Sequence, residues 1–266
     1  MSDFTNFGEN LVCKVVTGGD VTLPNDLHVA LLESADDETY TEVSYTGYQR
    51  LAIARSLATW SGTQGSTSTG QSTGSSRAIY NLIDFDFGQA GGSATVNALG
   101  IFAGDDQLCY ILLQTPIVIN ENDDVKIAAG TVSLTISNVG GFTDWGVNQL
   151  LDYLYRGIPS PFQNAYRMAL YVVTPSLAGG GTECAGRGYA RVNVNTWGEP
   201  ENGVIACPDL TQYPAPQGAW GTIQGAGLIE PGGNLVFVNA FQDAKTIPAG
   251  AAAPRFPANS ITVTVA

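Results

Sequence analysis

Residues 41–53 read TEVSYTGYQRLAI and residues 182–194 read TECAGRGYARVNV, so one short pattern occurs twice in this chain. Self-similarity at a fixed spacing indicates that one structural unit is repeated along the sequence. The identical residues are Thr41, Glu42, Gly47, Tyr48 and Arg50 in the first copy, and Thr182, Glu183, Gly188, Tyr189 and Arg191 in the second.

The similarity continues on both sides of this pattern. Upstream, LHVALL (27–32) matches YRMALY (166–171), and downstream KIAAGTVSLTI (126–136) matches RFPANSITVTV (255–265). The sequence therefore predicts two copies of one module, with these bounds: a first module at residues 1–138, a linker at 139–147 and a second module at 148–266.

The first copy contains a surplus segment, SGTQGSTSTGQSTGSS (61–76), that the second copy lacks. Its Ser, Thr and Gly residues offer almost no apolar surface to bury. We expect this segment to be too polar to pack and to form a long mobile loop.

Each copy starts with a short apolar segment. From Leu150 to Tyr155 the apolar residues recur at helical spacing until Gly157 and Pro159 end the pattern, which predicts a short helix. The counterpart at Leu11–Val16 is richer in valine, so the sequence leaves helix and strand open there.

The remaining segments of each copy have the composition of strands. YILLQTPIVI (110–119) and NLVFVNAF (234–241) are rich in β-branched and aromatic residues. In the last segment of each copy apolar residues alternate with Thr and Ser, which predicts one buried face: Val132, Leu134 and Ile136, and Ile261, Val263 and Val265. Short strands separated by turn residues are typical of sandwiches. We predict a mainly β fold of two tandem antiparallel, jelly-roll-like β-sandwich modules, each preceded by a short helix.

Charge and hydropathy restrict the kinds of partner. The formal net charge is -13, with 24 acidic residues against 11 Lys and Arg. Because nucleic-acid binding draws most of its affinity from clustered basic residues, we expect no nucleic-acid partner. No apolar run is long enough to cross a bilayer and the start, MSDFTNFGEN, has no basic and apolar leader, so we expect a soluble chain with neither a membrane partner nor a cleaved export signal.

The four cysteines lack the spacing of a metal site. Cys13 and Cys109 lie in the first copy and Cys184 and Cys207 in the second, with no CxxC pair and no nearby histidine. A disulfide within each copy is possible, but we expect reduced, largely buried thiols in a chain made in the cytosol.

Residues suited to catalysis are few. The single histidine, His28, has Arg167 at its place in the second copy, so we interpret it as structural. Most of the acidic clusters are flanked by residues typical of turns, and none has the spacing of a calcium-binding loop. We interpret these clusters as solvated turns: Asp36–Glu38, Asp84 and Asp86, Asp105 and Asp106, and Glu121 to Asp124. We expect no catalytic activity, no metal and no cofactor.

The stretch GGGTECAGRGYAR (179–191) suggests a phosphate-binding loop, but the comparison of copies argues against it. It has no Lys, no helix pattern follows it, and the first copy has acidic residues in place of the glycine triplet. What both copies keep is Thr-Glu, Gly-Tyr and Arg, which predicts an ion pair or polar network across a hairpin, with the Tyr as an anchor in the core or at an interface. We therefore expect no small-molecule ligand here.

The second copy resembles a module of structural proteins of tailed bacteriophages. The residues that carry the resemblance are ALYVVTPSLAGGGTECAGRGYARVNV (169–194), WGTIQGAGLIEPGGNLVFVNAF (220–241) and RFPANSITVTV (255–265), with counterparts VNALGIFAGDDQLCYIL (96–112) and VKIAAGTVSLTI (125–136) in the first copy. The first copy departs from the pattern, because it has Tyr-Gln-Arg for Tyr-Ala-Arg and no Trp-Gly pair.

The resemblance implies a virion component without catalysis, built of β-sandwich modules and assembled in the host cytoplasm. Our main expectation is a capsid decoration or cement protein that binds the major capsid protein and copies of itself, with a trimer as the candidate oligomer. The alternative is a tail-fibre or baseplate-associated protein with a structural or host-binding role.

Overall fold

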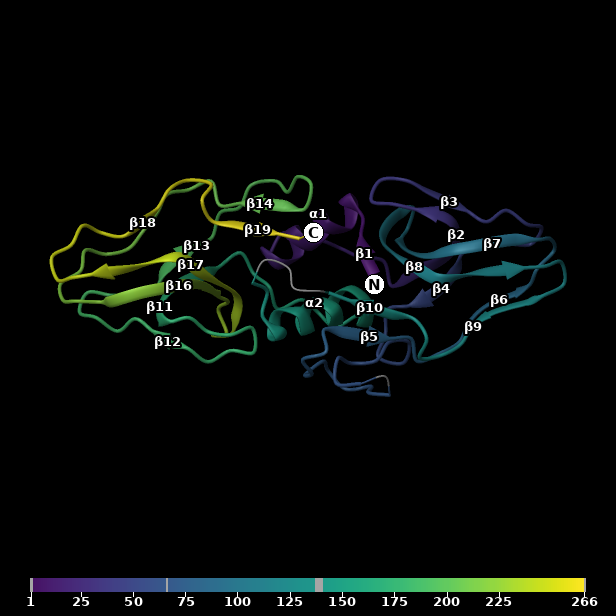
Figure 1. The fold of residues 1–266 in the computed structure, drawn as a ribbon, viewed down its shortest axis with the longest axis horizontal. Coiled ribbons are helices and arrows are strands. Elements are labelled where there is room, and N and C mark those ends of the chain that lie inside the picture. The colour runs from purple at the N-terminus through teal and green to yellow at the C-terminus, as the bar shows by residue number, and fades with distance from the viewer. Residues whose placement is uncertain (1, 66, 137–140, 266) are drawn as a thin grey trace.

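The structure is a computed structural model that describes residues 2–65, 67–136 and 141–265. It is mainly β, with antiparallel sheets and two helices among the described residues, as the sequence predicts. Figure 1 shows an elongated molecule with one β lobe at each end and the helices between them.

The strands of the first copy are β1 (Ser2–Phe4), β2 (Asp26–Ala35), β3 (Tyr40–Glu42), β4 (Leu51–Ala54), β5 (Ala78–Tyr80), β6 (Phe85–Gln89), β7 (Ala94–Ala103), β8 (Asp106–Ile119), β9 (Asp124–Ile127) and β10 (Ser133–Thr135). Those of the second copy are β11 (Tyr166–Val173), β12 (Thr182–Glu183), β13 (Val192–Val194), β14 (Val204–Ala206), β15 (Thr211–Gln212), β16 (Gly221–Ile229), β17 (Leu235–Ile247), β18 (Arg255–Phe256) and β19 (Thr262–Thr264). The helices are α1 (Asn6–Val16) and α2 (Asp144–Arg156).

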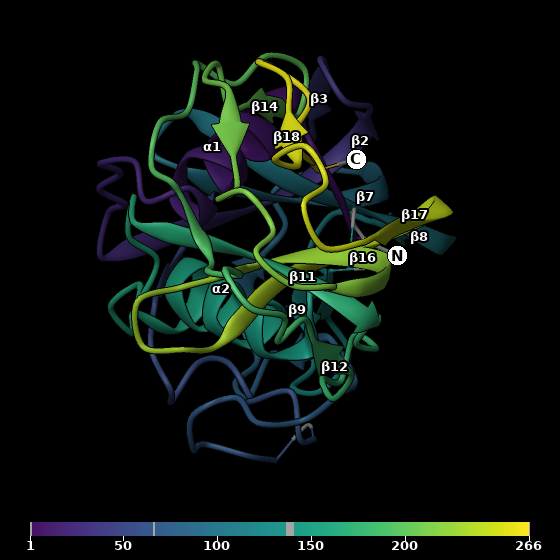
Figure 2. The ribbon, with the colours of Figure 1, turned by 90° about the vertical axis from the view of Figure 1, so that its left-hand side faces the viewer.

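The two copies have the same topology apart from β1, an edge strand that only the main sheet of the first copy has among the described residues. The main sheet of the first runs β1-β8-β7-β2-β3 with β4 also on β2, and that of the second runs β12-β11-β16-β17 with β13 also on β11. Two short ladders complete each copy, β5–β10 and β6–β9 in the first, and β14–β19 and β15–β18 in the second. Viewed from the end of the second lobe, β14 and β18 lie on one side of β11 and β16 of the main sheet (Figure 2).

The predicted buried faces of the last strands are confirmed. Val132, Leu134 and Ile136 are buried, and so are the three corresponding residues of the second copy. They share the core with the main sheets, so the short ladders act as a second layer of each lobe.

Both helices begin at a threonine. The hydroxyl of Thr5 accepts a hydrogen bond from the Gly8 N–H at 3.2 Å, and that of Thr143 accepts one from Gly146 at the same distance. The valine-rich segment that the sequence left open is therefore helical. Residues 144–147, which we expected in the linker, belong to α2, and residues 139 and 140 of that linker lie outside the described residues.

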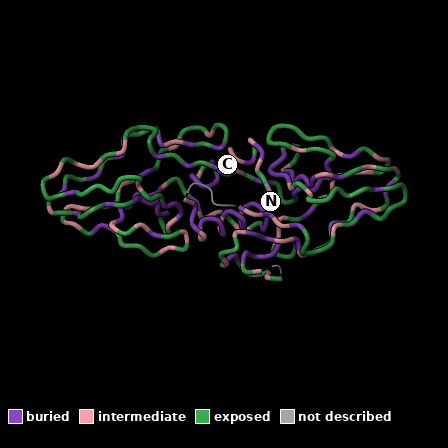
Figure 3. The backbone as a smooth tube through the Cα atoms, viewed as in Figure 1, coloured by how far each residue is buried: buried purple, intermediate pink, exposed green. Residues whose placement is uncertain are grey.

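The core is continuous from one copy to the other. One cluster of buried apolar side chains contains members of both lobes and of both helices, and buried backbone runs through the middle of the molecule in Figure 3. Helix α1 contacts β8 of its own copy and β14 of the other copy. Helix α2 lies beside β5 and β10 of the first copy in Figure 1, and its Tyr155 ring lies 5.7 Å from that of Trp60. Each helix thus covers part of the opposite copy.

The expectation for residues 61–76 is wrong in one respect, because this segment does pack. Ser61, Thr63 and Ser72 are buried with exposed fractions of at most 4%. Polar side chains can be buried where hydrogen bonds compensate them: the hydroxyls of Thr63 and Ser72 bond to side chains of α2, and that of Ser61 bonds to backbone groups of Gly62 and Tyr80.

Candidate functional site

The repeated residues of the first copy form one polar network. The Tyr48 hydroxyl donates to the Glu42 carboxylate at 3.1 Å and accepts from the Leu31 N–H at 2.9 Å. The Arg50 guanidinium donates to the same carboxylate through Nε at 2.9 Å and through a terminal nitrogen at 2.7 Å. The network therefore ties the segment after β3 and the start of β4 back to β2.

The second copy repeats this network in detail. The Tyr189 hydroxyl donates to Glu183 at 2.9 Å and accepts from the Leu170 N–H at 2.9 Å. Arg191 binds both carboxylate oxygens of Glu183, at 2.9 and 2.7 Å, in the two-pronged geometry that favours Arg over Lys. The ion pair that the sequence predicted is therefore present in both copies.

The conserved spacing has a backbone cause. Gly47 has φ 87° and Gly188 has φ 83°, in the left-handed region that a side chain disfavours. Each glycine turns the chain so that the following tyrosine points back at its carboxylate. Thr41 and Thr182 lie in the short strands β3 and β12, where they pair with β2 and β11.

The two networks differ in their surroundings. The Arg50 guanidinium lies 3.8 Å from the centre of the Phe102 ring and donates to the Tyr40 hydroxyl at 3.1 Å, so it is enclosed by aromatic groups. Arg191 is more open, with 37% of its side chain exposed against 21% for Arg50.

The ionisation of these groups follows their contacts. Hydrogen bonds from Arg191 hold the pKa of Glu183 below its ordinary value, and the hydrogen bond to Glu183 raises the pKa of Arg191. Burial raises the pKa of Tyr48 and of Tyr189. At neutral pH the network of the second copy therefore holds a carboxylate, a guanidinium and a neutral phenol, an arrangement that stabilises the hairpin.

The structure does not bring the two networks together. One lies in each lobe, near β3 in one and near β12 and β13 in the other (Figure 1). They are equivalent local structures and not two halves of one site.

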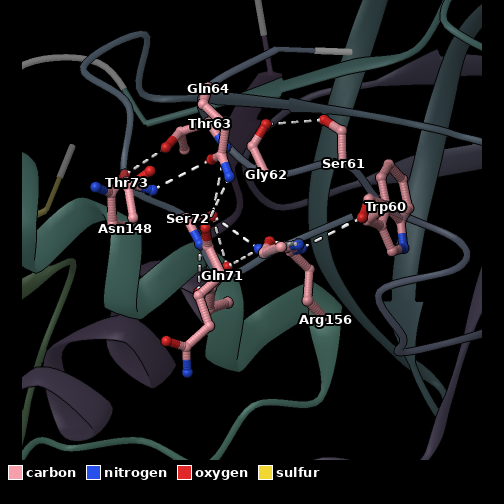
Figure 4. Close-up of polar contacts among 12 residues, drawn as sticks. Trp60, Ser61, Gly62, Thr63, Gln64, Gln71, Ser72, Thr73, Asn148 and Arg156 are labelled. Carbon is pink, nitrogen blue, oxygen red and sulfur yellow. Dashed lines mark hydrogen bonds and ion pairs between the residues drawn. The ribbon is translucent and has the colours of Figure 1, made fainter. Parts of the chain in front are cut away.

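A second polar cluster joins the two copies, and its residues were not singled out from the sequence (Figure 4). Arg156 and Asp152 of α2 form an ion pair in which 0% and 2% of the side chains are exposed. The Asp152 carboxylate accepts from the Ser72 hydroxyl at 2.6 Å and from the Ser72 N–H at 3.0 Å. Arg156 also donates to the carbonyl oxygens of Trp60 and Gly70.

This cluster explains how the surplus segment of the first copy is held. Asn148, one turn earlier on α2, lies 2.6 Å from the Thr63 hydroxyl and donates to the Gly74 carbonyl at 3.1 Å. Arg77, just after the segment, forms an ion pair with Asp144 at 2.9 Å. We call these contacts between α2 and residues 60–77 the joint.

The opposite side of the molecule has a smaller set of contacts between the copies. The Gly203 N–H donates to the Asn10 side chain at 3.0 Å, and the Cys13 thiol lies 3.3 Å from the Gly203 carbonyl. Lys14 pairs with Glu199 at 2.9 Å near the surface. Helix α1 therefore packs against a short loop of the second copy that includes Glu199 and Gly203, whereas α2 packs against the longer segment 60–77 of the first copy.

The remaining candidates from the sequence do not form a reactive site. His28 lies in β2, and its Nδ1 atom is buried with no hydrogen-bond partner among the described residues. Asp36 and Asp123 accept backbone N–H groups within their own turns, as the interpretation of their clusters as turns predicts. For the other two clusters the interpretation is wrong in part, because Asp86 lies in β6, where it forms an ion pair with Lys126, and Asp106 lies in β8.

The four cysteines are buried, free thiols. In the described part of the chain, no group of three or more His, Cys, Asp or Glu residues is placed to hold a metal ion. Within the same ranges, neither helix has the length and hydropathy to cross a membrane.

Comparison with known proteins supports the repeat and gives it a family. The family model described as Podophage GP4 fiber I protein gp80 matches the chain twice, over residues 3–135 and again over residues 141–264. Each match spans one copy, including the helix and the Glu–Tyr–Arg network of that copy. No curated protein matches the chain.

Proposed function

Because the chain belongs to the Podophage GP4 fiber I protein gp80 family, in which it carries the family unit twice, we propose that it is a non-enzymatic component of the fibres on a bacteriophage tail. The observation that carries the proposal is this match over both copies. The family match supports a structural protein of the phage virion. We infer the position on the tail from the description of the family as a fibre protein.

The build of the molecule supports a mechanical role. The two copies share one core, and the buried Arg156–Asp152 pair fixes α2 against the first copy. A buried charge pair favours one relative position of the two elements that it joins, because displacing one partner leaves the other charge buried without a counter-ion. The chain is therefore suited to hold two β lobes at a fixed distance and angle, as a segment of a fibre must.

Our main expectation from the sequence, a capsid decoration protein on the major capsid lattice, receives no support from the family. The match favours the alternative, a tail-fibre component. Self-association, including the possible trimer, stays a prediction.

The proposal is tested by separating purified particles into heads and tails and measuring the chain in each fraction by quantitative mass spectrometry. A fibre component is expected in the tail fraction, at a copy number set by the symmetry of the tail. Recovery with the heads, in numbers that approach those of the major capsid protein, would support decoration and refute the fibre proposal.

A further inference from the structure

A groove of about 620 Å³ lies in the second lobe, between β17 and residues 251–256. Its volume is in the range of pockets that hold small ligands, roughly 300–1,000 Å³. Leu170 and Ile223 form apolar parts of its wall. Figure 1 places β18 in the outer part of the second lobe, and β17 starts near α2 and runs toward that part.

Strand β17 supplies alternate side chains to this groove. Phe241, Asp243, Lys245 and Ile247 all line it, as the period of a strand requires. Phe256 of β18 lies opposite, with its ring centre 6.1 Å from that of Phe241, and both rings are partly exposed. The groove therefore combines aromatic surface with charged and hydrogen-bonding groups.

The first copy has an equivalent groove of about 260 Å³, between β8 and β9. Strand register gives the correspondence, because Ile223 pairs with Lys245 in the second copy and Val96 pairs with Ile117 in the first. An apolar side chain, Ile117, thus stands where the second groove has an ammonium group.

The second cation of the groove, Arg255, also lacks the carboxylate partner that its counterpart in the first copy has. In the first copy Lys126 lies opposite Asp86 and forms an ion pair with it at 3.1 Å. In the second copy Arg255 lies opposite Gln212, so the carboxylate is replaced by a neutral amide. Among the described residues, neither Lys245 nor Arg255 has a carboxylate within ion-pair distance.

We propose that the groove of the second lobe binds an acidic saccharide. Lys245 and Arg255 pair with its carboxylate, sulfate or phosphate group, because Arg and Lys recognise such anions through charge-assisted hydrogen bonds. The Phe241 and Phe256 rings pack against the apolar face of a sugar ring, and the Asp243 carboxylate accepts hydrogen bonds from its hydroxyl groups.

The duplicated fold makes this a specific inference. The same strands build both grooves, and only one of them carries two unpaired cations on a chain of net charge -13. A nucleic acid or a long acidic peptide would extend beyond the groove and be repelled by the negative charge of the surrounding surface. A short saccharide contacts the two cations and does not extend over that surface. The inference deepens the proposed fibre function, since it names what the outer part of the second lobe holds.

The experiment uses the ¹⁵N-labelled full-length chain and four probes: a hyaluronan tetrasaccharide, a chondroitin sulfate tetrasaccharide, neutral chitotetraose and a hexaglutamate peptide. Amide chemical shifts are followed during titration with each probe. We expect at least one acidic saccharide to shift the amides of residues 241–247 and 251–256 and not those of residues 117–127, with affinity that falls as salt rises.

Two variants each remove one cation from the second groove, and Lys245→Ile also introduces the type of side chain that Ile117 supplies in the first groove. Lys245→Ile and Arg255→Gln should each weaken binding by about tenfold or more, since each removes a charge-assisted contact. Lys126→Gln is the matched control in the first groove and should leave affinity unchanged. Both substituted side chains of the second groove are exposed, and thermal unfolding checks that the variants stay folded.

The proposal is overturned if neither acidic saccharide shifts the groove amides, or if chitotetraose or hexaglutamate binds as tightly as the acidic sugars. It is also overturned if the Lys126→Gln variant loses as much affinity as the two groove variants. If the chain is found on the tail but no acidic saccharide binds, only the ligand proposal is refuted. If the chain is found on the head but the saccharides bind, only the proposed fibre function is refuted.

Discussion

Arg156→Met is the substitution that most directly tests the joint. Its guanidinium donates to the Trp60 carbonyl at 3.2 Å, to the Ser72 hydroxyl at 2.9 Å, to the Gly70 carbonyl and to Asp152, and none of the side chain is exposed. Methionine fills a similar volume but leaves the Asp152 carboxylate buried without its counter-ion.

The expected loss in the free energy of unfolding is about 3–5 kcal/mol, the usual effect of removing one partner of a buried pair. The matched control is Arg191→Met, because 37% of that side chain is exposed and such pairs contribute about 0–1 kcal/mol. Equilibrium unfolding in urea gives both values. Arg156→Lys should fall between wild type and Arg156→Met, since it keeps the charge and loses the planar fork.

The double variant Arg156→Met with Asp152→Asn separates the two causes of the loss. Removing the stranded charge should recover part of the stability, so the double variant should be more stable than Arg156→Met alone. Equal stability of Arg156→Met and Arg191→Met would refute the buried joint. So would a double variant that is as unstable as the two single losses added together.

Three further outcomes follow from the structure. The pKa of Glu183 is lowered in the folded chain, so its contribution is present above its ordinary value of 4.5 and is lost as pH falls through the folded pKa. Glu183→Gln should therefore destabilise at neutral pH and flatten the acid limb of a plot of stability against pH; an unchanged limb would contradict this. Gly8→Ala should cost about 1–3 kcal/mol, because its Cβ would lie 1.9 Å from a carbonyl oxygen of β8, whereas Gly198→Ala, with its nearest neighbour at 3.5 Å, should be nearly neutral in the same urea assay. Burial raises the pKa of Cys13 and of Cys109 to about 12, so both thiols should resist Ellman's reagent in the native chain and react in urea, and rapid native labelling of either would be inconsistent with the core described.

The repeat made much of the fold predictable. Comparison of the copies identified Gly47 and Gly188 as one of the identical pairs, and the positive φ of both residues gives the physical reason for glycine there. The same comparison paired Glu42 with Arg50 across one hairpin, because the spacing of those residues survives while their neighbours change. Local patterns of this kind depend only on nearby residues, which the sequence displays.

The joint was not predictable in the same way. Asp152 and Arg156 are spaced as an ordinary ion pair on the outside of a helix. Their burial depends on Ser72 and Trp60, which lie far away in the sequence and reach α2 only after the copies pack together. The one available signal was that the polar segment 61–76 occurs in the first copy alone, and that α2 carries an Asp where α1 has Cys13.

The groove required the register of the strands. The correspondence between Lys245 and Ile117 follows from the pairing of β16 with β17 and of β7 with β8, and both ladders contain a shift in register before these residues. A bulge changes which side chains share a face, so spacing along the sequence alone does not give the correspondence.

The most direct test of the account is the position of the chain on intact particles. An affinity-tagged copy labelled with nanogold and imaged by cryo-electron tomography should place the gold on fibres at the tail, with the head surface unlabelled. Gold distributed over the head lattice, with unlabelled tails, would contradict the fibre function.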